Sequence, residues 1–373
     1  MILDDQSLHD IWQLLEEFSK QDGDQLKINY DGFSQCLAAG CGVQVANKAR
    51  EMFGGMVDPC FKPSLFARFA QDSDGYISAT LFAAHLSMRA HMQALRIQLS
   101  SFDEGDTGCL KEQQLGEFLR TQAMELVLLE DMQHYCNIAA RKIMFFHGKN
   151  GSVKIKELLT SPLMKELLDL REPDPCDPCD LLANWFSLQS TTRVHDTFLA
   201  LDQDMNGMLS RSEFSEISNR TMSPLFIQRI FEEHVMQRRN IMHRSSTHRD
   251  EMDLTAFADF VLAWDHRSHP AAIKYFFPVL DLKNQGFVTP AEIYTFFKEI
   301  HVMWVNMGEY ADLAIYDVVD EILDMVKPKT ATLITPEDLE VSSMSGIFFS
   351  MLADVKLFHN YNYRENFIHQ EES

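Results

Sequence analysis

Residues 202–213 read Asp-Gln-Asp-Met-Asn-Gly-Met-Leu-Ser-Arg-Ser-Glu, which is the spacing of a complete twelve-residue EF-hand calcium loop. Such a loop needs oxygen ligands at positions 1, 3, 5, 7, 9 and 12, and a glycine at position 6 for the sharp turn. Gly207 takes position 6. The candidate ligands are Asp202, Asp204, Asn206, the backbone carbonyl of Met208, Ser210 and Glu213. The loop predicts a calcium site between two helices. The alternatives are a solvated acidic turn and a degenerate hand that keeps only the shape.

The same template recurs along the chain. An EF-hand carries an apolar residue at position 8, which bridges to a partner loop, and another at position 13, which opens the exiting helix. Eight such pairs recur at intervals of about 35 to 55 residues, a spacing typical of a helix–loop–helix repeat. The pairs, numbered hands 1 to 8, are Ile28/Phe33, Ile77/Phe82, Leu110/Leu115, Val153/Leu158, Leu209/Phe214, Met252/Phe257, Val288/Ile293 and Ile334/Leu339. Because a lone loop exposes its strand edge, we expect four pairs: 1 with 2, 3 with 4, 5 with 6, and 7 with 8.

Most of these loops lack calcium ligands. Hand 2 has Ala70 at position 1, hand 4 has Phe146 there, and hand 8 (residues 327–338) has Lys327. Affinity depends on the charge and number of the ligands, so these hands are predicted to be structural. The sequence therefore predicts an all-α, elongated chain of tandem EF-hand pairs, mostly degenerate.

Hand 7, residues 281–292, is the difficult case. Asp281 and Glu292 hold positions 1 and 12, and Gln285 and Thr289 offer neutral oxygens. Lys283, however, places an ammonium at position 3, where the ion needs an oxygen. We expect no calcium here at physiological concentrations, with binding despite Lys283 as the alternative.

Composition restricts the function classes. The 373 residues carry a formal net charge of −22, which argues against a nucleic-acid or anionic-membrane surface. No apolar run approaches the ~20 residues that span a bilayer. The chain has neither a phosphate-binding glycine loop nor a Gly-x-Ser-x-Gly elbow, so we expect it not to be an enzyme.

Two segments interrupt the repeat. Residues 172–183 form an acidic, proline-rich stretch containing Cys176 and Cys179, which we interpret as a linker, with metal or redox chemistry as the alternative. A structural zinc site needs four ligands, and no second Cys/His pair accompanies the two cysteines. The expected division is a helical region 1–171, the linker 172–183, an EF-hand region 184–303 and a C-terminal region 304–373. A basic segment, 238–249, is interpreted as a solvated insertion, with docking or phosphorylation as the alternative.

The second half of the chain resembles the B″ regulatory subunits of protein phosphatase 2A, and the gamma-type branch most. The resemblance spans roughly residues 8 to 360. The segments that carry it are Asn184-Trp-Phe-Ser187, Leu201–Ser210, Met252–Ala263, His269-Pro-Ala-Ala-Ile273, Tyr275-Phe-Phe277 and Asp320–Lys329, with Lys27–Tyr30 near the start. Hand 7 matches the intact loop of alpha- and beta-type members only at Asp281, Gly286 and Glu292.

This resemblance implies a non-catalytic, calcium-binding subunit. It would bind the scaffold subunit as a monomer within a heterotrimer and direct the catalytic subunit to substrates, with no nucleic-acid or membrane partner. The implied location is the cytoplasm, in association with the cytoskeleton or the centrosome, because the branch includes plant proteins that organise cortical microtubules. The alternative is a free-standing EF-hand calcium sensor or cytoskeletal adaptor that acts independently of the phosphatase.

Overall fold

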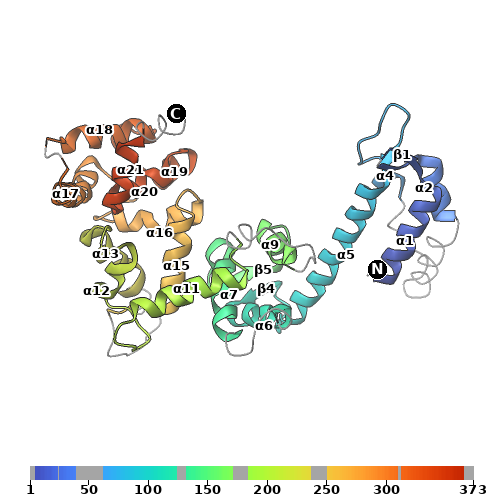
Figure 1. Ribbon diagram of the computed structural model, residues 1–373, viewed down its shortest axis with the longest axis horizontal. Coiled ribbons are helices and arrows are strands. Elements are labelled where there is room, and N and C mark those ends of the chain that lie inside the picture. Colours follow the sequence, from blue (N-terminus) through green and yellow to red (C-terminus); the bar gives the residue numbers. More distant parts are fainter. Residues whose placement is uncertain are drawn as a thin grey trace. The chain divides into compact units, whose positions relative to one another are not determined.

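The computed structural model describes seven stretches of the chain and divides it into two compact units, Met1–Cys109 and Leu110–Ser373 (Figure 1). The described residues are 5–23, 25–38, 62–123, 132–170, 184–236, 250–309 and 312–364. Helices dominate both units, and the longest described strand has four residues. The predicted all-α class is confirmed.

The first unit holds hands 1 and 2. Its elements are α1 (Asp5–Phe18), β1 (Lys20–Asp22), β2 (Gln25–Ile28), α2 (Tyr30–Ala38), α4 (Pro63–Phe66), β3 (Ile77–Ser78) and the long α5 (Ala79–Ser101). The three strands form one antiparallel sheet in the order β1-β2-β3, with Ile28 opposite Ile77. The Ser78 hydroxyl accepts a hydrogen bond from the Leu81 N–H at 3.2 Å, which caps α5 where the sheet ends.

The second unit, with the strand that leads into it, holds hands 3 to 8. Its elements are β4 (Cys109–Lys111), α6 (Glu112–Ala123), α7 (Met132–His147), β5 (Ser152–Lys154), α8 (Ile155–Leu159), α9 (Pro162–Asp169), α11 (Leu188–Leu201), α12 (Arg211–Phe214), the 3₁₀ turn η1 (Ser215–Ser218), α13 (Pro224–Ile230), the π-helical turn η2 (Phe231–Met236), α15 (Leu254–Asp265), α16 (Pro270–Leu280), α17 (Pro290–Asn306), α18 (Ile315–Val326), α19 (Pro336–Val341), α20 (Ser345–Ala353) and α21 (Val355–Asn362).

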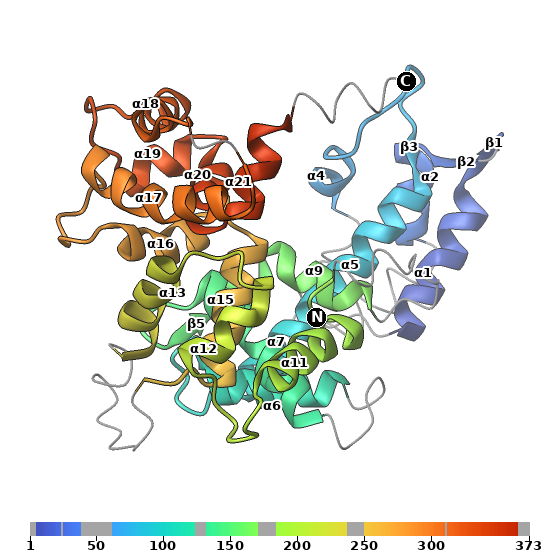
Figure 2. The same ribbon diagram turned by 60° about the vertical axis from the view of Figure 1, so that its left-hand side comes forward.

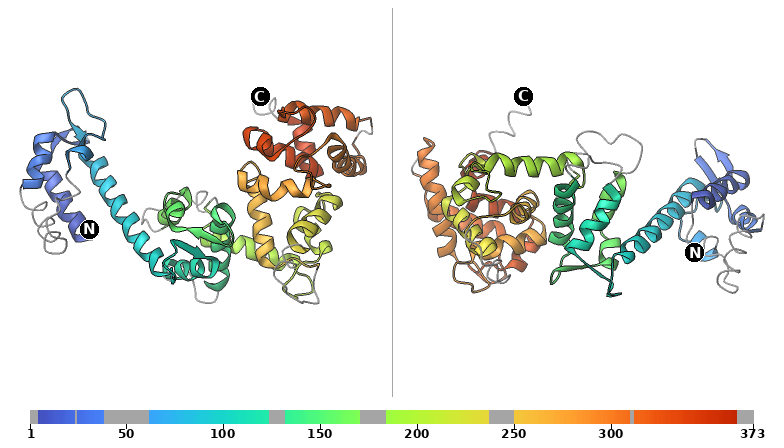
Figure 3. Two further views of the ribbon diagram at one scale, coloured as in Figure 1. Left: turned by 180° about the vertical axis from the view of Figure 1, so that it is seen from behind. Right: turned by 90° about the horizontal axis from the view of Figure 1, so that it is seen from below.

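The buried core of hands 5 to 8 extends to α7 of hands 3–4. Helix α7 packs against α6, α11 and α15, so that α11, the helix entering hand 5, lies against hands 3–4 (Figure 3). Helices α20 and α21 pack against α17 (Figure 2). Ile138 of α7 belongs to the same buried cluster as Phe257 of α15 and Trp304 of α17. Hands 5 to 8 therefore share one apolar core, and α7 of hands 3–4 packs on it through Ile138; apolar burial is the dominant stabilising term in folding.

The eight-hand repeat predicted from the sequence is confirmed. All sixteen residues at positions 8 and 13 are at most 1% exposed. Backbone pairing joins Ile28 with Ile77, β4 with β5, Leu209 with Met252, and Val288 with Ile334, so the four expected pairs form. The glycines at position 6 of hands 2, 3, 4, 5 and 7 have φ between 71° and 80°, a conformation that favours glycine.

Two of the segments singled out in the sequence fall outside the described stretches. These are the linker 172–183 with Cys176 and Cys179, and the basic segment 238–249. The expected division at the linker stays a prediction, although elements from either side of it, α7 and α15, pack together. Among the described residues, no helix is both long and apolar enough to cross a membrane.

Candidate metal centre

Hand 5 is built between two helix ends. Helix α11 ends at Leu201, so that Asp202 is the C-cap residue and the first residue of the loop. Helix α12 begins after Ser210, whose hydroxyl caps it by accepting from the Glu213 N–H at 3.3 Å. Between them, Leu209 and Met252 exchange two backbone hydrogen bonds of 2.8 Å. The loop is therefore held at both helix ends and at its bridge to hand 6.

The first half of the loop wraps around its own carboxylates. Asp202 is 5% exposed, and its two oxygens accept from the N–H groups of Asn206 and Gly207 at 3.1 and 2.8 Å. Asp204 accepts from the N–H and the side-chain amide of Asn206 at 3.1 and 3.0 Å. The Asn206 side-chain oxygen accepts from the Met208 N–H at 2.7 Å. These bonds direct positions 1, 3 and 5 toward one point.

Glu213 closes the loop from the other side. One carboxylate oxygen accepts from the Ser210 N–H and hydroxyl at 2.8 and 2.7 Å, and the other accepts from the Gln203 N–H at 3.0 Å. Burial alone would raise the pKa of Glu213, but these hydrogen bonds outweigh it and hold the pKa below its usual value. A carboxylate whose pKa is lowered by folding stabilises the folded state at pH values above its usual pKa. This stabilisation is lost as the pH falls through the lowered pKa, so acid weakens the closure of the loop by Glu213.

Three of the predicted ligands form one cluster. Carboxylate oxygens of Asp202, Asp204 and Glu213 lie within 4.8 Å of one another. Among the described residues, no lysine or arginine forms an ion pair with any of the three. Converging like charges repel, and a set of hard oxygen donors suits Ca²⁺. The residues fit the ion. Asn206, the Met208 carbonyl and Ser210 complete the candidate ligand set at their loop positions.

The degenerate hands replace the ion with bonds inside the protein. In hand 2, Asp72 pairs with Lys27 of hand 1 at 3.2 Å. In hand 8, Asp338 at position 12 accepts from the Thr335 N–H and hydroxyl at 3.0 and 2.8 Å and from the Lys329 N–H at 3.1 Å. In these two loops, which lack a full ligand set, an ion pair and hydrogen bonds within the protein hold the carboxylates in place.

Sequence reasoning missed Arg141, which connects hands 3–4 to hands 5–6. Its guanidinium donates to both oxygens of Asp259 on α15, at 2.6 to 2.9 Å, and to Glu112 on α6 at 2.9 Å. Burial alone would lower the pKa of Arg141, but Asp259 and Glu112 raise it. No local motif indicates this contact, because Arg141 and Asp259 are separated by 118 residues in the sequence.

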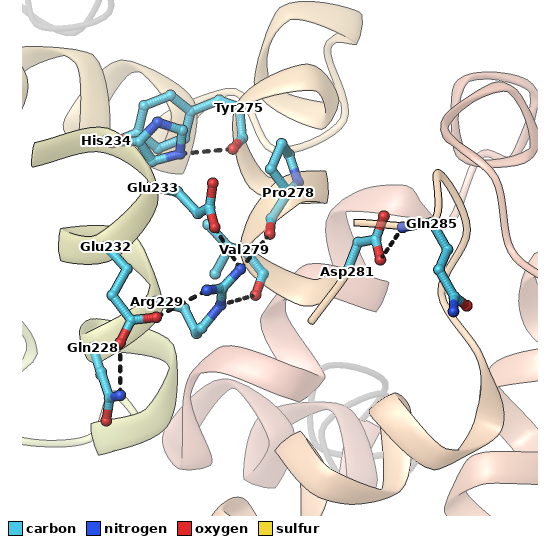
Figure 4. Close-up of polar contacts among 10 residues, drawn as sticks. All are labelled: Gln228, Arg229, Glu232, Glu233, His234, Tyr275, Pro278, Val279, Asp281 and Gln285. Atoms are coloured by element: carbon cyan, nitrogen blue, oxygen red, sulfur yellow. Dashed lines mark hydrogen bonds and ion pairs between the residues drawn. The ribbon is translucent and has the colours of Figure 1, made fainter. Parts of the chain in front are cut away.

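Arg229, also missed, joins the pair of hands 5 and 6 to hand 7 (Figure 4). It lies on α13 and donates to the carbonyls of Pro278 and Val279 at 2.9 and 3.2 Å. Glu232 and Glu233 hold the same guanidinium at 2.8 and 2.6 Å. Pro278 and Val279 lie in the last turn of α16, where carbonyls lack partners within the helix. Asp281, the C-cap residue of α16, opens the loop of hand 7.

Comparison with known proteins identifies the family. No family model matches the chain. TON2 of Arabidopsis thaliana, a probable B″-type regulatory subunit of serine/threonine-protein phosphatase 2A, is 35% identical over 353 residues, which are 92% of this chain and 71% of that protein. The gamma member of the B″ regulatory subunits in Homo sapiens is 31% identical over 374 residues, 98% of this chain and 77% of that protein.

A solved structure supports the fold. A chain of the PP2A PR70 holoenzyme superposes with a TM-score of 0.58 at 20% identity, covering 69% of this chain and 94% of that one. Identity this low bears on the fold alone. The two relatives match nearly the whole length of this chain, and they support the family assignment. The resemblance found from the sequence is confirmed. The chain belongs to the B″ family of regulatory subunits of serine/threonine-protein phosphatase 2A.

Proposed function

We propose that the chain is a non-catalytic regulatory subunit of protein phosphatase 2A. It would bind the scaffold subunit and direct the catalytic subunit to its substrates. Family membership along nearly the whole chain carries this proposal, and the sequence offers no catalytic motif against it. The likeness to TON2 and to the gamma-type proteins favours substrates at the cytoskeleton.

Calcium at hand 5 is the second part of the proposal. Its ligands would be Asp202, Asp204, Asn206, the Met208 carbonyl, Ser210 and Glu213. The convergence of three carboxylate groups within 4.8 Å is the observation that supports it. The solved PR70 holoenzyme is designated a diCa form, which favours calcium as the ion. Intact sensor loops bind with dissociation constants of about 10⁻⁷ to 10⁻⁵ M.

We expect calcium to strengthen docking about tenfold. A bound ion draws position 12 toward positions 1 and 3, and so favours one placement of the helix that starts at Arg211. A ligand shifts an equilibrium only by its differential affinity for the two states, and a tenfold difference corresponds to about 1.4 kcal/mol of coupling. The measurement is the affinity of the full chain for immobilised scaffold subunit, with calcium and with a chelator, for the wild type and Asp202→Ala.

The outcomes separate the alternatives. Equal affinity of the wild type in calcium and chelator would mean that the ion is structural. Failure to bind the scaffold both in calcium and in chelator, by a chain that does bind calcium when it is supplied, would favour a free-standing sensor or cytoskeletal adaptor. Phosphatase activity of the purified chain alone would contradict the non-catalytic assignment.

A further inference from the structure

Hand 7 reproduces the backbone geometry of hand 5 in detail. Asp281 accepts from the N–H groups of Gln285 and Gly286 at 3.0 and 2.7 Å, against 3.1 and 2.8 Å for the equivalent bonds of hand 5. Glu292 accepts from the Thr289 N–H and hydroxyl at 2.8 and 2.9 Å. Gly286 has φ 80°, and its counterpart in hand 5 has φ 78°. The turn, the closure and the bridge to hand 8 are all in place.

The two carboxylate residues of the hand 7 loop are almost completely buried. Asp281 is 4% exposed and Glu292 is 3% exposed. The Oε1 atom of Glu292 is buried and has no hydrogen-bond partner among the described residues. In hand 5 the same atom of Glu213 accepts from the Gln203 N–H. An ionised oxygen buried without a partner is costly, so the geometry leaves a buried oxygen suited to a cation.

Lys283 is the residue that sets hand 7 apart. At the charged ligand positions, hand 5 has three carboxylates, a formal charge of −3, whereas hand 7 has two carboxylates and one ammonium, a formal charge of −1. Lys283 is exposed, and within the described part of the chain it forms no ion pair. Its ammonium can donate hydrogen bonds but cannot ligate a metal, and it repels a divalent ion. The residues present therefore do not fit calcium.

We infer that Lys283 alone excludes calcium from hand 7, and that the loop is otherwise a preformed site. This goes beyond the proposed function, because it assigns a selectivity residue in a hand that the calcium proposal does not use. Replacing Lys283 with aspartate would supply an oxygen at position 3 and restore a charge of −3. The side chain is exposed, so the substitution disturbs no packed contact.

The test places Lys283→Asp in a Glu213→Gln background, where hand 5 no longer binds. Isothermal titration with calcium is expected to show no site in Glu213→Gln alone, and one site in the double variant with a dissociation constant of about 10⁻⁷ to 10⁻⁵ M. Glu213→Gln/Lys298→Asp is the matched control, since it makes the same charge change at an exposed lysine of α17. Calcium should raise the melting temperature of the double variant and leave that of the control unchanged.

Two results would overturn the inference. One is calcium binding by Glu213→Gln alone that Glu292→Gln removes, because hand 7 would then bind despite Lys283. The other is a folded Lys283→Asp double variant, by circular dichroism, that binds no calcium. Lys283→Asn, tested in parallel, should bind more weakly than Lys283→Asp. If hand 5 itself does not bind, the wild type will show no site, while the double variant still reports on hand 7.

Discussion

Glu213→Gln should remove calcium binding by hand 5, with a loss of affinity of at least about 100-fold. Altering residues that only support a metal's ligands typically costs 10- to 100-fold, and Glu213 is expected to contact the ion through both oxygens. The amide is nearly isosteric, so the hydrogen bond from the Ser210 N–H can persist at the amide oxygen. Isothermal titration of the full chain measures the effect.

The control for this variant is Glu216→Gln, just after the loop. Glu216 pairs with the exposed Arg220 at the surface, so the variant makes the same charge change outside the ligand set. It should bind calcium like the wild type. Retention of the site in Glu213→Gln, or an equal loss in both variants, would show that hand 5 does not hold the ion as described.

Arg141→Ala should cost about 3 to 5 kcal/mol of stability, the usual effect of removing one partner from a buried ion pair. The side chains of Arg141 and Asp259 are each 12% exposed. Without the guanidinium, the Asp259 carboxylate loses a charge partner that binds both of its oxygens. Urea unfolding followed by circular dichroism measures the change. Arg141→Lys should recover only part of it, because lysine keeps the charge but cannot form the planar two-oxygen contact.

The matched comparison is Arg193→Ala. Arg193 on α11 pairs with Asp265 on α15 at 3.2 Å, but its side chain is 53% exposed. Solvated pairs of this kind contribute about 0 to 1 kcal/mol. Similar losses in Arg141→Ala and Arg193→Ala would show that the Arg141 contact does not join hands 3–4 to hands 5–6 as the distances indicate.

The repeat could be predicted from the sequence because its signal is local. Position 8 must be apolar to bridge two loops and position 13 must be apolar to start a packed helix, and the two are always at the same spacing. Residues as far apart as Ile28 and Leu339 are buried for this one reason. The candidate ligands of hand 5 follow from an equally local signal, the spacing of oxygen-bearing residues in one twelve-residue loop, and the structure brings Asp202, Asp204 and Glu213 together.

The contacts between pairs of hands could not be predicted in this way. Arg141 and Asp259 are far apart in sequence, and either residue alone looks like part of a solvated helix face. The same holds for Arg229, whose acceptors are backbone carbonyls and leave no trace in the residue pattern. The compact units divide between Cys109 and Leu110, where no proline-rich stretch marks a boundary, because long-range packing rather than composition defines them.

The hydrogen bonds of Arg229 have a consequence for how motion passes along the second unit. Phe214, the first core residue after the hand 5 loop, packs edge-on against Phe231 at 5.6 Å between ring centroids. Phe231 directly follows the helix that carries Arg229, and Arg229 fixes the two residues Pro278 and Val279 shortly before Asp281. These hydrogen bonds therefore directly connect the pair of hands 5 and 6 with the pair of hands 7 and 8. If hand 5 binds calcium as proposed, we expect a shift of Phe214 to reach the start of the hand 7 loop through Phe231 and Arg229.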